Sequence, residues 1–496
     1  MDTGDDTCLK ITDDLLMLEK GGEEFLLTDY VDLRPLYIRK GKRYISNFLK
    51  AIPELKTRKR IVEAFPQDAA LLDTLLDHGI VVPDSFTRNK VKNYSPEALD
   101  LNHRPKMSLY LLVSQSCNLG CTYCLNGRST YQTDKALKME KAVAFKSVDR
   151  CIDEISLGGR LEVVFFGGEP LLNWPLVKDT IMYCEESVKT RHPDKEIHFH
   201  ITSNLSMLPA DLVEWAQRYN ITFLCDIDGP PAIHNACRPY KDGRPSHDRI
   251  VDNIKHLIDA GLKVDLRATI TAHNQNQLVQ VAEHHKAIGG NSSAFIPVNP
   301  VNSDEDILNG ELLPSPRKMA KSLIKVYRSG VWKCEELFPF NLYAQRLRPG
   351  TMTVLGCGLP FGNTPVVGAS GDVFPCIYLV GIKRYFIGNM MDGTYPNKEL
   401  LKRLYTQLHV DHMEKCGDCS WRYMCGGGGC PLWRLTVLDN PAVTQSTIDY
   451  CSEAACGYTK TLMEALLWDK ARKSATQLTE SLLNNHSEST PNPTHC

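Results

Sequence analysis

Residues 109–124 read Leu109-Tyr110-Leu111-Leu112-Val113-Ser114-Gln115-Ser116-Cys117-Asn118-Leu119-Gly120-Cys121-Thr122-Tyr123-Cys124. The apolar half predicts a buried strand, and the three cysteines follow in a loop with the spacing C-x3-C-x2-C. A structural zinc site closes with four protein ligands, and no further Cys or His follows until Cys151. A cubane iron–sulfur cluster held by three thiolates instead keeps one iron free for a small molecule. The motif therefore predicts a reactive iron–sulfur centre, with zinc binding or simple core packing as the alternative.

Composition narrows the class of protein further. The chain has 496 residues, enough for two to four domains, and its 43% hydrophobic content supports a large core. A net charge of −2 gives no bulk attraction to nucleic acid or anionic membranes. The first residues lack the features of a signal peptide, and no apolar run approaches the roughly 18 residues of a membrane-spanning helix. We therefore expect a cytoplasmic protein with reduced thiols, in which the eighteen cysteines serve as metal ligands more readily than as disulfides.

The N-terminal part predicts a small α+β domain over residues 1–100. Two apolar runs at 15–18 and 24–27, separated by Gly21-Gly22, indicate a hairpin. Apolar residues at helical spacing follow at 44–52, 58–65 and 69–78, and a polar linker covers 94–105. This order resembles the winged-helix peptide-binding domain that is often fused to peptide-modifying enzymes. The alternative is an extension that packs on the core.

From residue 105 to about 320, strands and helices alternate. Strands are expected at 109–113, 162–166, 197–203, 222–226, 263–270 and 294–298, and helices at 140–155, 174–189, 209–219, 248–260 and 275–288. Six β/α units predict an α/β fold with a parallel sheet, either open or curled into a partial barrel. Function in such folds lies at the carboxyl ends of the strands, which is where the three-cysteine loop falls.

A second motif follows the second predicted strand. Residues 163–170 read Val163-Val164-Phe165-Phe166-Gly167-Gly168-Glu169-Pro170. The two glycines allow the backbone to approach a ligand closely, and the proline suits the start of a helix. Together with the C-x3-C-x2-C loop, this turn resembles the radical SAM superfamily.

That resemblance implies a partial (β/α)6 TIM-like barrel with a 4Fe–4S cluster on Cys117, Cys121 and Cys124. In the family, S-adenosylmethionine chelates the open iron, and one electron from the cluster cleaves it to a 5′-deoxyadenosyl radical. Gly167, Gly168 and Glu169 would meet the amino group of this cofactor, and Tyr123 would lie beside its adenine.

The later strand tips supply further polar residues. The resemblance implies that Ser203, Asn204, Asp228 and Arg267 contact the cofactor or shape the substrate cavity. A carboxylate at Asp228 could instead hold a turn by accepting backbone N–H groups. The guanidinium of Arg267 suits bidentate pairing with a carboxylate, and its alternative role is an ion pair across strand tips.

The cysteine-rich segment within residues 330–470 resembles the SPASM extension of radical SAM enzymes. It contains, in order, Cys357, Cys376, Cys416, Cys419, Cys425, Cys430 and Cys451. The resemblance implies two auxiliary 4Fe–4S clusters. One would use Cys416, Cys419, Cys425 and Cys451, and the other would use Cys357, Cys376 and Cys430.

Two departures from the SPASM pattern matter. Four glycines separate Cys425 from Cys430, and no additional cysteine lies between Cys357 and Cys376. Either Cys456 completes the second set, or that cluster keeps an open iron that could bind a substrate thiolate. A pair of zinc sites built on the C-x2-C of Cys416 and Cys419 is the alternative.

The combination resembles maturases of ribosomal peptides and protein subunits, including thioether formers such as the quinohemoprotein amine dehydrogenase type and carbon–carbon crosslinkers. It implies a peptide or protein substrate and a reductant such as flavodoxin or ferredoxin, with no nucleic-acid or membrane partner. Anaerobic sulfatase maturation to formylglycine is one alternative, but those enzymes typically carry an Asp where this chain has Ile377. A non-catalytic iron–sulfur or zinc scaffold is another. No catalytic side chain is identified, and residues 474–496 read as a disordered tail.

Overall fold

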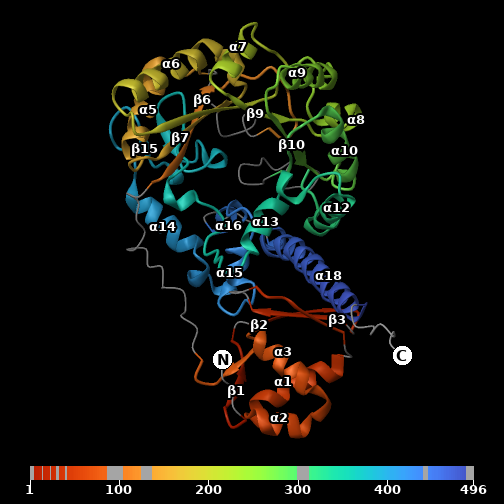
Figure 1. Cartoon of the computed structure of the whole chain (residues 1–496). Helices are drawn as coiled ribbons and strands as arrows, with labels where there is room; N and C mark the ends of the chain where they lie inside the picture. The colour runs from red at the N-terminus through yellow and green to blue at the C-terminus, as the bar shows by residue number, and fades with distance from the viewer. Residues whose placement is uncertain are drawn as a thin grey trace, which may run out of the picture.

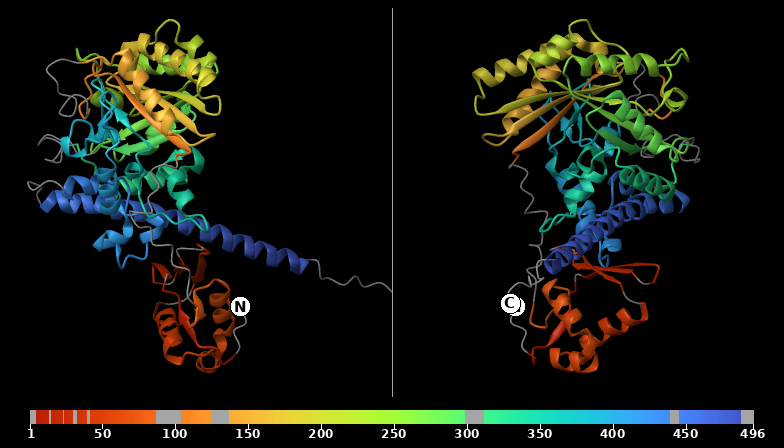
Figure 2. Two further views of the ribbon diagram at one scale, coloured as in Figure 1. Left: turned by 90° about the vertical axis from the view of Figure 1, so that its left-hand side faces the viewer. Right: turned by 45° about the vertical axis from the view of Figure 1, so that its right-hand side comes forward.

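The computed structural model describes residues 5–13, 15–22, 24–29, 33–39, 42–86, 104–124, 137–298, 312–438 and 445–487. A large sheet with its helices lies at one end of the molecule and the N-terminal unit at the other (Figure 1). The long helix α18 (Tyr458–Ser487) passes between them in all three views (Figures 1 and 2).

The central sheet has ten strands, and seven of them run parallel in chain order. These are β6 (Lys106–Ser114), β7 (Arg160–Gly167), β8 (Glu196–Ser203), β9 (Thr222–Asp226), β10 (Val264–Ile270), β11 (Ser293–Pro297) and β12 (Leu337–Phe338). The six predicted strands are thus confirmed, and so is the mostly parallel α/β class. Beyond β6, the sheet continues through β13 (Val366–Val367), β14 (Asp372–Phe374) and β15 (Gly388–Asn389) from the cysteine-rich segment.

Helices pack on the outer face of this sheet (Figure 2). They are α5 (Lys141–Glu154), α6 (Trp174–Thr190), α7 (Leu212–Arg218), α8 (Pro231–Cys237), α9 (His247–Asp259), α10 (Leu278–Ile288) and α12 (Pro316–Ser329). Alternation along β7 explains the two faces: Val163 and Phe165 are buried in the core with the helices, whereas Phe166 reaches a cavity on the other face. The main apolar core therefore lies between the sheet and the helices on its outer face, and the cavity lies on the inner face.

The N-terminal unit matches the predicted hairpin and three helices. It contains β1 (Leu9–Ile11), β2 (Leu15–Lys20), β3 (Glu24–Asp29), β4 (Leu36–Arg39), α1 (Lys42–Leu55), α2 (Arg58–Ala64), α3 (Ala69–Asp77) and β5 (Val81–Pro83). One face of the β2-β3-β4 sheet packs on the helices through Phe25 and Leu27. The other face shares a core with α18, where Leu26 joins Leu462 and Trp468. Residues 94–103 of the predicted linker lie outside the described residues.

The C-terminal part is built from short helices and turns. Its helices are α13 (Phe340–Arg346), α14 (Lys398–Leu408), α15 (Arg422–Cys425), α16 (Leu432–Leu438) and α17 (Gln445–Ser452), followed by a π-helix at Glu453–Gly457 and by α18. Short 3-10 turns occupy Pro66–Asp68, Pro170–Asn173, Cys334–Glu336, Leu359–Phe361, Ile377–Leu379, Lys383–Tyr385, Val410–His412 and Glu414–Cys416. Within the described residues, no helix is both long enough and apolar enough to span a membrane.

The expected tail differs from the structure over part of its length. Helix α18 continues to Ser487, into the segment 474–496 that the sequence analysis expects to be disordered. The physical reason is local: residues 475–483 contain several helix-forming Ala, Gln, Glu and Leu residues and no Gly or Pro. Residues 488–496 lie outside the described residues.

Candidate active site

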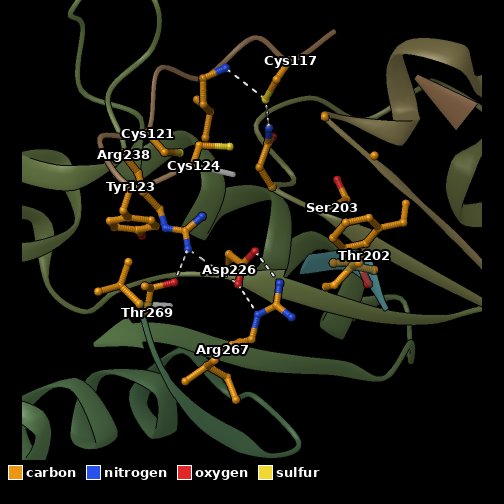
Figure 3. A pocket seen from close by; sticks show the side chains of 18 of the residues that line it. Cys117, Cys121, Tyr123, Cys124, Thr202, Ser203, Asp226, Arg238, Arg267 and Thr269 are labelled. Carbon is orange, nitrogen blue, oxygen red and sulfur yellow. Dashed lines mark hydrogen bonds and ion pairs between the residues drawn. The ribbon is translucent and has the colours of Figure 1, made fainter. Parts of the chain in front are cut away.

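A cavity opens at the carboxyl ends of the parallel strands. It encloses about 1040 Å³ of space, including the solvent at its mouth. Its walls come from the three-cysteine loop, from the tips of β7 to β11 and from the turn that carries Ile377 and Tyr378. Figure 3 shows the labelled cysteines on one side of this space and Asp226, Arg267 and Thr269 on another.

The three-cysteine loop is held rigidly at the cavity rim. Gly120 N–H donates to the Pro239 carbonyl at 2.8 Å, and Thr122 N–H donates to the Cys237 carbonyl at 2.9 Å. Burial raises the pKa of the Cys121 thiol to about 12. A thiolate here therefore needs a bound cation as a partner, and the iron of a cluster would supply one.

The other two cysteines of the loop also line the cavity. Burial raises the pKa of Cys117 to about 11, while N–H groups of Leu119 and Asn204 lie 3.4 Å and 3.6 Å from its sulfur. Cys124 lies beside them on the same wall (Figure 3). Cys151 is fully buried among the helices of the outer core, so it does not supply a fourth ligand.

The Gly-Gly-Glu turn is locked against the base of this loop. Gly167 has φ +135°, and a Cβ at this position would overlap the carbonyl oxygen of Ser114. Gly168 N–H donates to that same carbonyl at 2.7 Å, and Glu169 N–H donates to the Ser116 carbonyl at 2.8 Å. Both glycines line the cavity.

The side chain of Glu169 lies beneath the cavity wall and is fully buried. Its carboxylate accepts hydrogen bonds from Leu171 N–H at 3.0 Å, Ser203 Oγ at 2.9 Å and Asn204 N–H at 2.9 Å. Burial raises its pKa to about 7, although these three donors favour the charged form. Glu169 thus ties the tips of β7 and β8 together, while Ser203 and Asn204 themselves line the cavity.

Tyr123 is fixed by a buried ionic network. Its hydroxyl donates to Asp228, whose other oxygen accepts Thr269 N–H at 2.9 Å. The guanidinium of Arg238 lies 5.1 Å from the centre of the Tyr123 ring, and its Nε is 3.1 Å from the Asp228 carboxylate. Asp228 is completely buried and is absent from the cavity wall, and its carboxylate ties Tyr123 and Arg238 to the N–H of Thr269 on β10.

Arg267 lines the cavity and forms a bidentate ion pair with Asp226. Its Nε and Nη2 lie 2.5 Å and 2.8 Å from the two carboxylate oxygens. Burial opposes the charge on Asp226, but Arg267 and Arg238 outweigh it and hold its pKa at about 2. The guanidinium is therefore committed to the ion pair across two strand tips, which was the alternative role for this residue.

Sequence reasoning missed Arg238 and Tyr378. Arg238 is 6% exposed and points into the cavity from the chain after α8 (Figure 3). The charge balance of the sequence could have revealed Arg238. Asp226 and Asp228 are two acids at one strand tip, and when buried they require a second cation in addition to the predicted Arg267. Tyr378 reaches the cavity from a distant segment, and nothing in its local pattern predicts that.

One group of C-terminal cysteines lies directly behind this wall. Burial raises the thiol pKa of Cys430, and the neighbouring Cys376 and Cys357 raise it further. Burial likewise raises the pKa of Tyr378, which interacts with both Arg267 and Cys376. Tyr378 lines the cavity and follows Cys376 by two residues in the chain.

A second group contains Cys416, Cys419 and Cys425. Burial raises the pKa of Cys425, and Cys419 and Cys416 add to the effect. Cys451, which the sequence analysis assigns to this group, packs with Trp433 in an apolar cluster that Cys456 also contacts. Across the part of the chain that is described, no three Cys, His, Asp or Glu side chains are arranged to hold a single metal ion.

Comparisons with known proteins agree with this geometry. The radical SAM superfamily profile matches residues 111–288. An uncharacterized protein of Methanocaldococcus jannaschii, MJ0907, is 26% identical over 285 residues, covering 57% of this chain and 88% of that protein. A cysteine-type anaerobic sulfatase-maturating enzyme of Clostridium novyi is 23% identical over 349 residues, covering 65% of this chain and 87% of the enzyme.

A solved structure shares the fold. Native anSMEcpe with bound AdoMet and Kp18Cys peptide superposes with a TM-score of 0.59 at 20% identity, covering 74% of this chain and all of that one. The superfamily profile begins on β6 and ends on α10, so it includes the strands β7 to β10 that line the cavity. Residues 111–288 therefore form a radical SAM domain, and members of that superfamily are enzymes that bind a 4Fe–4S cluster and S-adenosylmethionine.

Proposed function

We propose that the chain is a peptide or protein maturase that cleaves S-adenosylmethionine reductively and modifies a ribosomal peptide or protein, forming a thioether or another crosslink. One observation carries the proposal: a three-cysteine loop and the turn that follows Cys376 line the same cavity. Cys117, Cys121 and Cys124 line it directly, and Ile377 and Tyr378, the two residues after Cys376, form another part of its wall. A substrate residue in this cavity would lie next to the first group of thiols and near the chain that carries the second.

The relatives support the same class of substrate. The Clostridium novyi protein is a sulfatase-maturating enzyme, and the anSMEcpe structure contains a bound peptide. The N-terminal unit, a three-stranded sheet with three helices, would recognise the substrate. We extend the proposal to the domain division: recognition by residues 1–100, a radical SAM partial barrel at 105–320 and a SPASM domain at 330–470.

The residues at the cavity fit the cofactors. Three cavity-lining thiols suit a cluster with one open iron, and Gly167 and Gly168 expose bare backbone where the amino group of the cofactor would lie. Arg238 is nearly buried and would meet its carboxylate. When bound, the cluster and S-adenosylmethionine supply the electron and the 5′-deoxyadenosyl radical that removes a substrate hydrogen.

The chain's own contribution is placement and exclusion of water. Tyr123 is held by Asp228 and by the charge of Arg238, so its ring forms a fixed wall for the adenine. Asp226 and Arg267 form part of the cavity wall, and the charge of each is neutralised by the other. Neither group needs to move when the cofactor binds.

The three thiols of Cys357, Cys376 and Cys430 favour bond formation to sulfur. Cys456, the candidate for a fourth ligand in this group, packs against the apolar cluster of Trp433 and Cys451. An auxiliary cluster on three thiolates would have an open iron to which a substrate thiolate could bind.

Formylglycine formation is the second candidate, because the relatives include sulfatase-maturating enzymes. The residue at the position of their typical Asp is Ile377, and it lines the cavity. An aliphatic side chain accepts no proton, so this cavity lacks the base that the reaction would use at that position. A non-catalytic scaffold would not consume S-adenosylmethionine.

The test is anaerobic reconstitution with iron and sulfide, followed by dithionite and S-adenosylmethionine. We expect about twelve irons per chain for three cubanes, and steady release of 5′-deoxyadenosine. Cys121→Ala is the matched control, because it removes one ligand of the cavity cluster and should abolish release. Zinc in place of iron, or intact clusters without cleavage, would reject the catalytic proposal. A flavodoxin or ferredoxin should replace dithionite as the reductant, and the cytoplasm is the expected compartment.

A further inference from the structure

A buried histidine lies directly behind the network that holds Tyr123. His234 is part of α8 and is completely buried. Its Nδ1 accepts the Asp228 N–H at 3.2 Å, and its Nε2 lies 3.1 Å from Ser246 Oγ. The hydroxyl of Ser246 in turn donates to the Arg238 carbonyl at 2.6 Å. One imidazole therefore connects the backbones of Asp228 and Arg238, the two residues that form the ion pair beside Tyr123.

The hydrogen-bond partners determine where this ring carries its proton. A backbone N–H can only donate, so Nδ1 of His234 must offer its lone pair to Asp228. The proton of the neutral imidazole is then on Nε2 and points to Ser246 Oγ, whose own proton is directed to the Arg238 carbonyl. Protonation of Nδ1 would remove the acceptor for Asp228 N–H and break this series of hydrogen bonds at its first member.

The surroundings of His234 favour the neutral ring. Burial holds its pKa well below the ordinary value, and the charges of Arg238 and His247 lower it further, against an opposing effect of Asp226. The centre of the His247 ring lies 5.7 Å away, and the His284 ring follows at 5.0 Å from His247. A second positive charge so close to a buried guanidinium would be costly. His234 therefore acts through neutral hydrogen bonds and not as a charge.

The main chain of Arg238 is fixed by the same residues on both sides. Its N–H donates to the His234 carbonyl at 2.8 Å, and its own carbonyl accepts the Ser246 hydroxyl. Its Nη2 donates to the Thr269 hydroxyl at 3.1 Å, while its Nε faces Asp228. Ser246 precedes α9 but makes no side-chain cap to that helix, so its hydroxyl is directed to His234 and Arg238 instead. The direction in which Arg238 enters the cavity thus depends on His234 and Ser246.

We propose that His234, in its neutral Nε2–H form, and Ser246 are positioning residues: they orient Arg238 and Asp228 so that the Arg238 guanidinium meets the carboxylate of S-adenosylmethionine. The inference rests on the proposed function, because that contact with the cofactor is part of it. Neither His234 nor Ser246 lines the cavity, so neither would touch the cofactor itself. Their effect on binding would pass through the residues that they hold.

The experiment compares Ser246→Ala with Ser147→Ala in the reconstituted full-length protein. Ser147 is an equally buried serine on α5 whose hydroxyl donates to the Val143 carbonyl at 2.7 Å, and it does not line the cavity. Each variant removes one buried hydrogen bond, so both should lose similar stability in thermal unfolding. Ser246→Ala alone should weaken binding of S-adenosylmethionine, by about 3- to 10-fold in Kd in anaerobic calorimetry. Equal affinity in the two variants would overturn the proposal.

A double-variant cycle tests whether the effect passes through Arg238. If it does, Ser246→Ala should weaken binding no further once Arg238→Met is present, whereas independent effects would add. Additive losses would refute positioning through Arg238. A second pair of variants tests the ring if Ser246→Ala does not fold: His234→Gln keeps an amide donor for Ser246 and should retain more affinity than His234→Leu, and equal loss in both would contradict the role of the Nε2 proton.

NMR of the cofactor-free protein labelled with nitrogen-15 histidine gives a readout that does not depend on the cofactor. The ring signals that are missing in His234→Gln should be those of a neutral Nε2–H imidazole near neutral pH. An Nδ1–H ring or a doubly protonated ring would overturn the assignment. A wild type that shows this tautomer but does not bind S-adenosylmethionine would instead reject the proposed function, and with it the role of His234 in cofactor binding, which separates the two failures.

Discussion

Replacing Arg238 with Met gives the sharpest test of how the cavity is built. Arg238 is the cation whose Nε lies 3.1 Å from the completely buried Asp228, and it also lies 3.6 Å from Asp226. Asp226 would retain Arg267, but Asp228 would keep only the hydrogen bonds from Tyr123 and Thr269. The variant therefore leaves one carboxylate without a cation.

Removing one partner of a buried ion pair costs about 3–5 kcal/mol. For a domain of this size, each kcal/mol shifts the melting temperature by about 2–4 °C, so we expect a decrease of about 6–20 °C. The measurement is thermal unfolding of the cofactor-free protein. A shift below about 2 °C would refute the view that Arg238 compensates Asp228.

The double variant Arg238→Met with Asp228→Asn separates stability from cofactor binding. It removes both charges together, which is far less costly than stranding one of them, so most of the lost stability should return. Release of 5′-deoxyadenosine should stay low, because the guanidinium proposed to meet the cofactor carboxylate is still missing. Recovery of both properties would show that Arg238 acts only through Asp228.

Three further predictions concern other parts of the fold. Gly167→Ala places a Cβ against the Ser114 carbonyl, in a backbone conformation unfavourable to alanine. It should lower the free energy of unfolding by about 1–3 kcal/mol, measured by urea denaturation. A variant as stable as the wild type would contradict the close packing. The pKa of Glu169 rises from 4.5 in the unfolded chain to about 7, so the folded protein holds this proton more tightly and the free energy of unfolding should fall by about 3 kcal/mol as pH rises through that window. Glu169→Gln should remove that slope, and an unchanged slope would exclude Glu169 as its source. Trp468→Ala removes a buried ring that contacts Tyr37, and it should lower the free energy of unfolding by about 3–5 kcal/mol. The N-terminal unit should then be cleaved faster in limited proteolysis. Unchanged protection would show that the shared core is dispensable.

The sequence predicted the part of the fold that rests on long apolar runs. Each of the six predicted strands carries enough alternating or continuous apolar residues to reveal its period. Strands β12 to β15 have two or three residues each, too few for any periodic signal, and they form only because β11 and β6 offer edges to pair with. The parallel class was therefore predictable, and the extension of the sheet by the cysteine-rich segment was not.

The candidate site divides in the same way. Gly167, Gly168, Ser203 and Asn204 line the cavity because each terminates a predicted strand, and strand order alone brings them to one edge. Sequence spacing did not reveal the packing of Cys451 and Cys456, which both lie at the apolar cluster around Trp433. That cluster depends on tertiary contacts between separate helices, which leave no local pattern in the sequence.

The position of the N-terminal unit constrains how a substrate would use this molecule. Its β2-β3-β4 sheet shares a core with α18, and Arg472 of that helix lies 3.4 Å from Glu24. The unit is thus fixed at the end of the molecule opposite the large sheet (Figure 1). If it holds one segment of a peptide, the residue that reaches the cavity must lie well away from that segment along the substrate chain. Recognition and chemistry would then be separable: sequence changes in the held segment should alter binding, whereas changes near the modified residue should alter the reaction in the cavity.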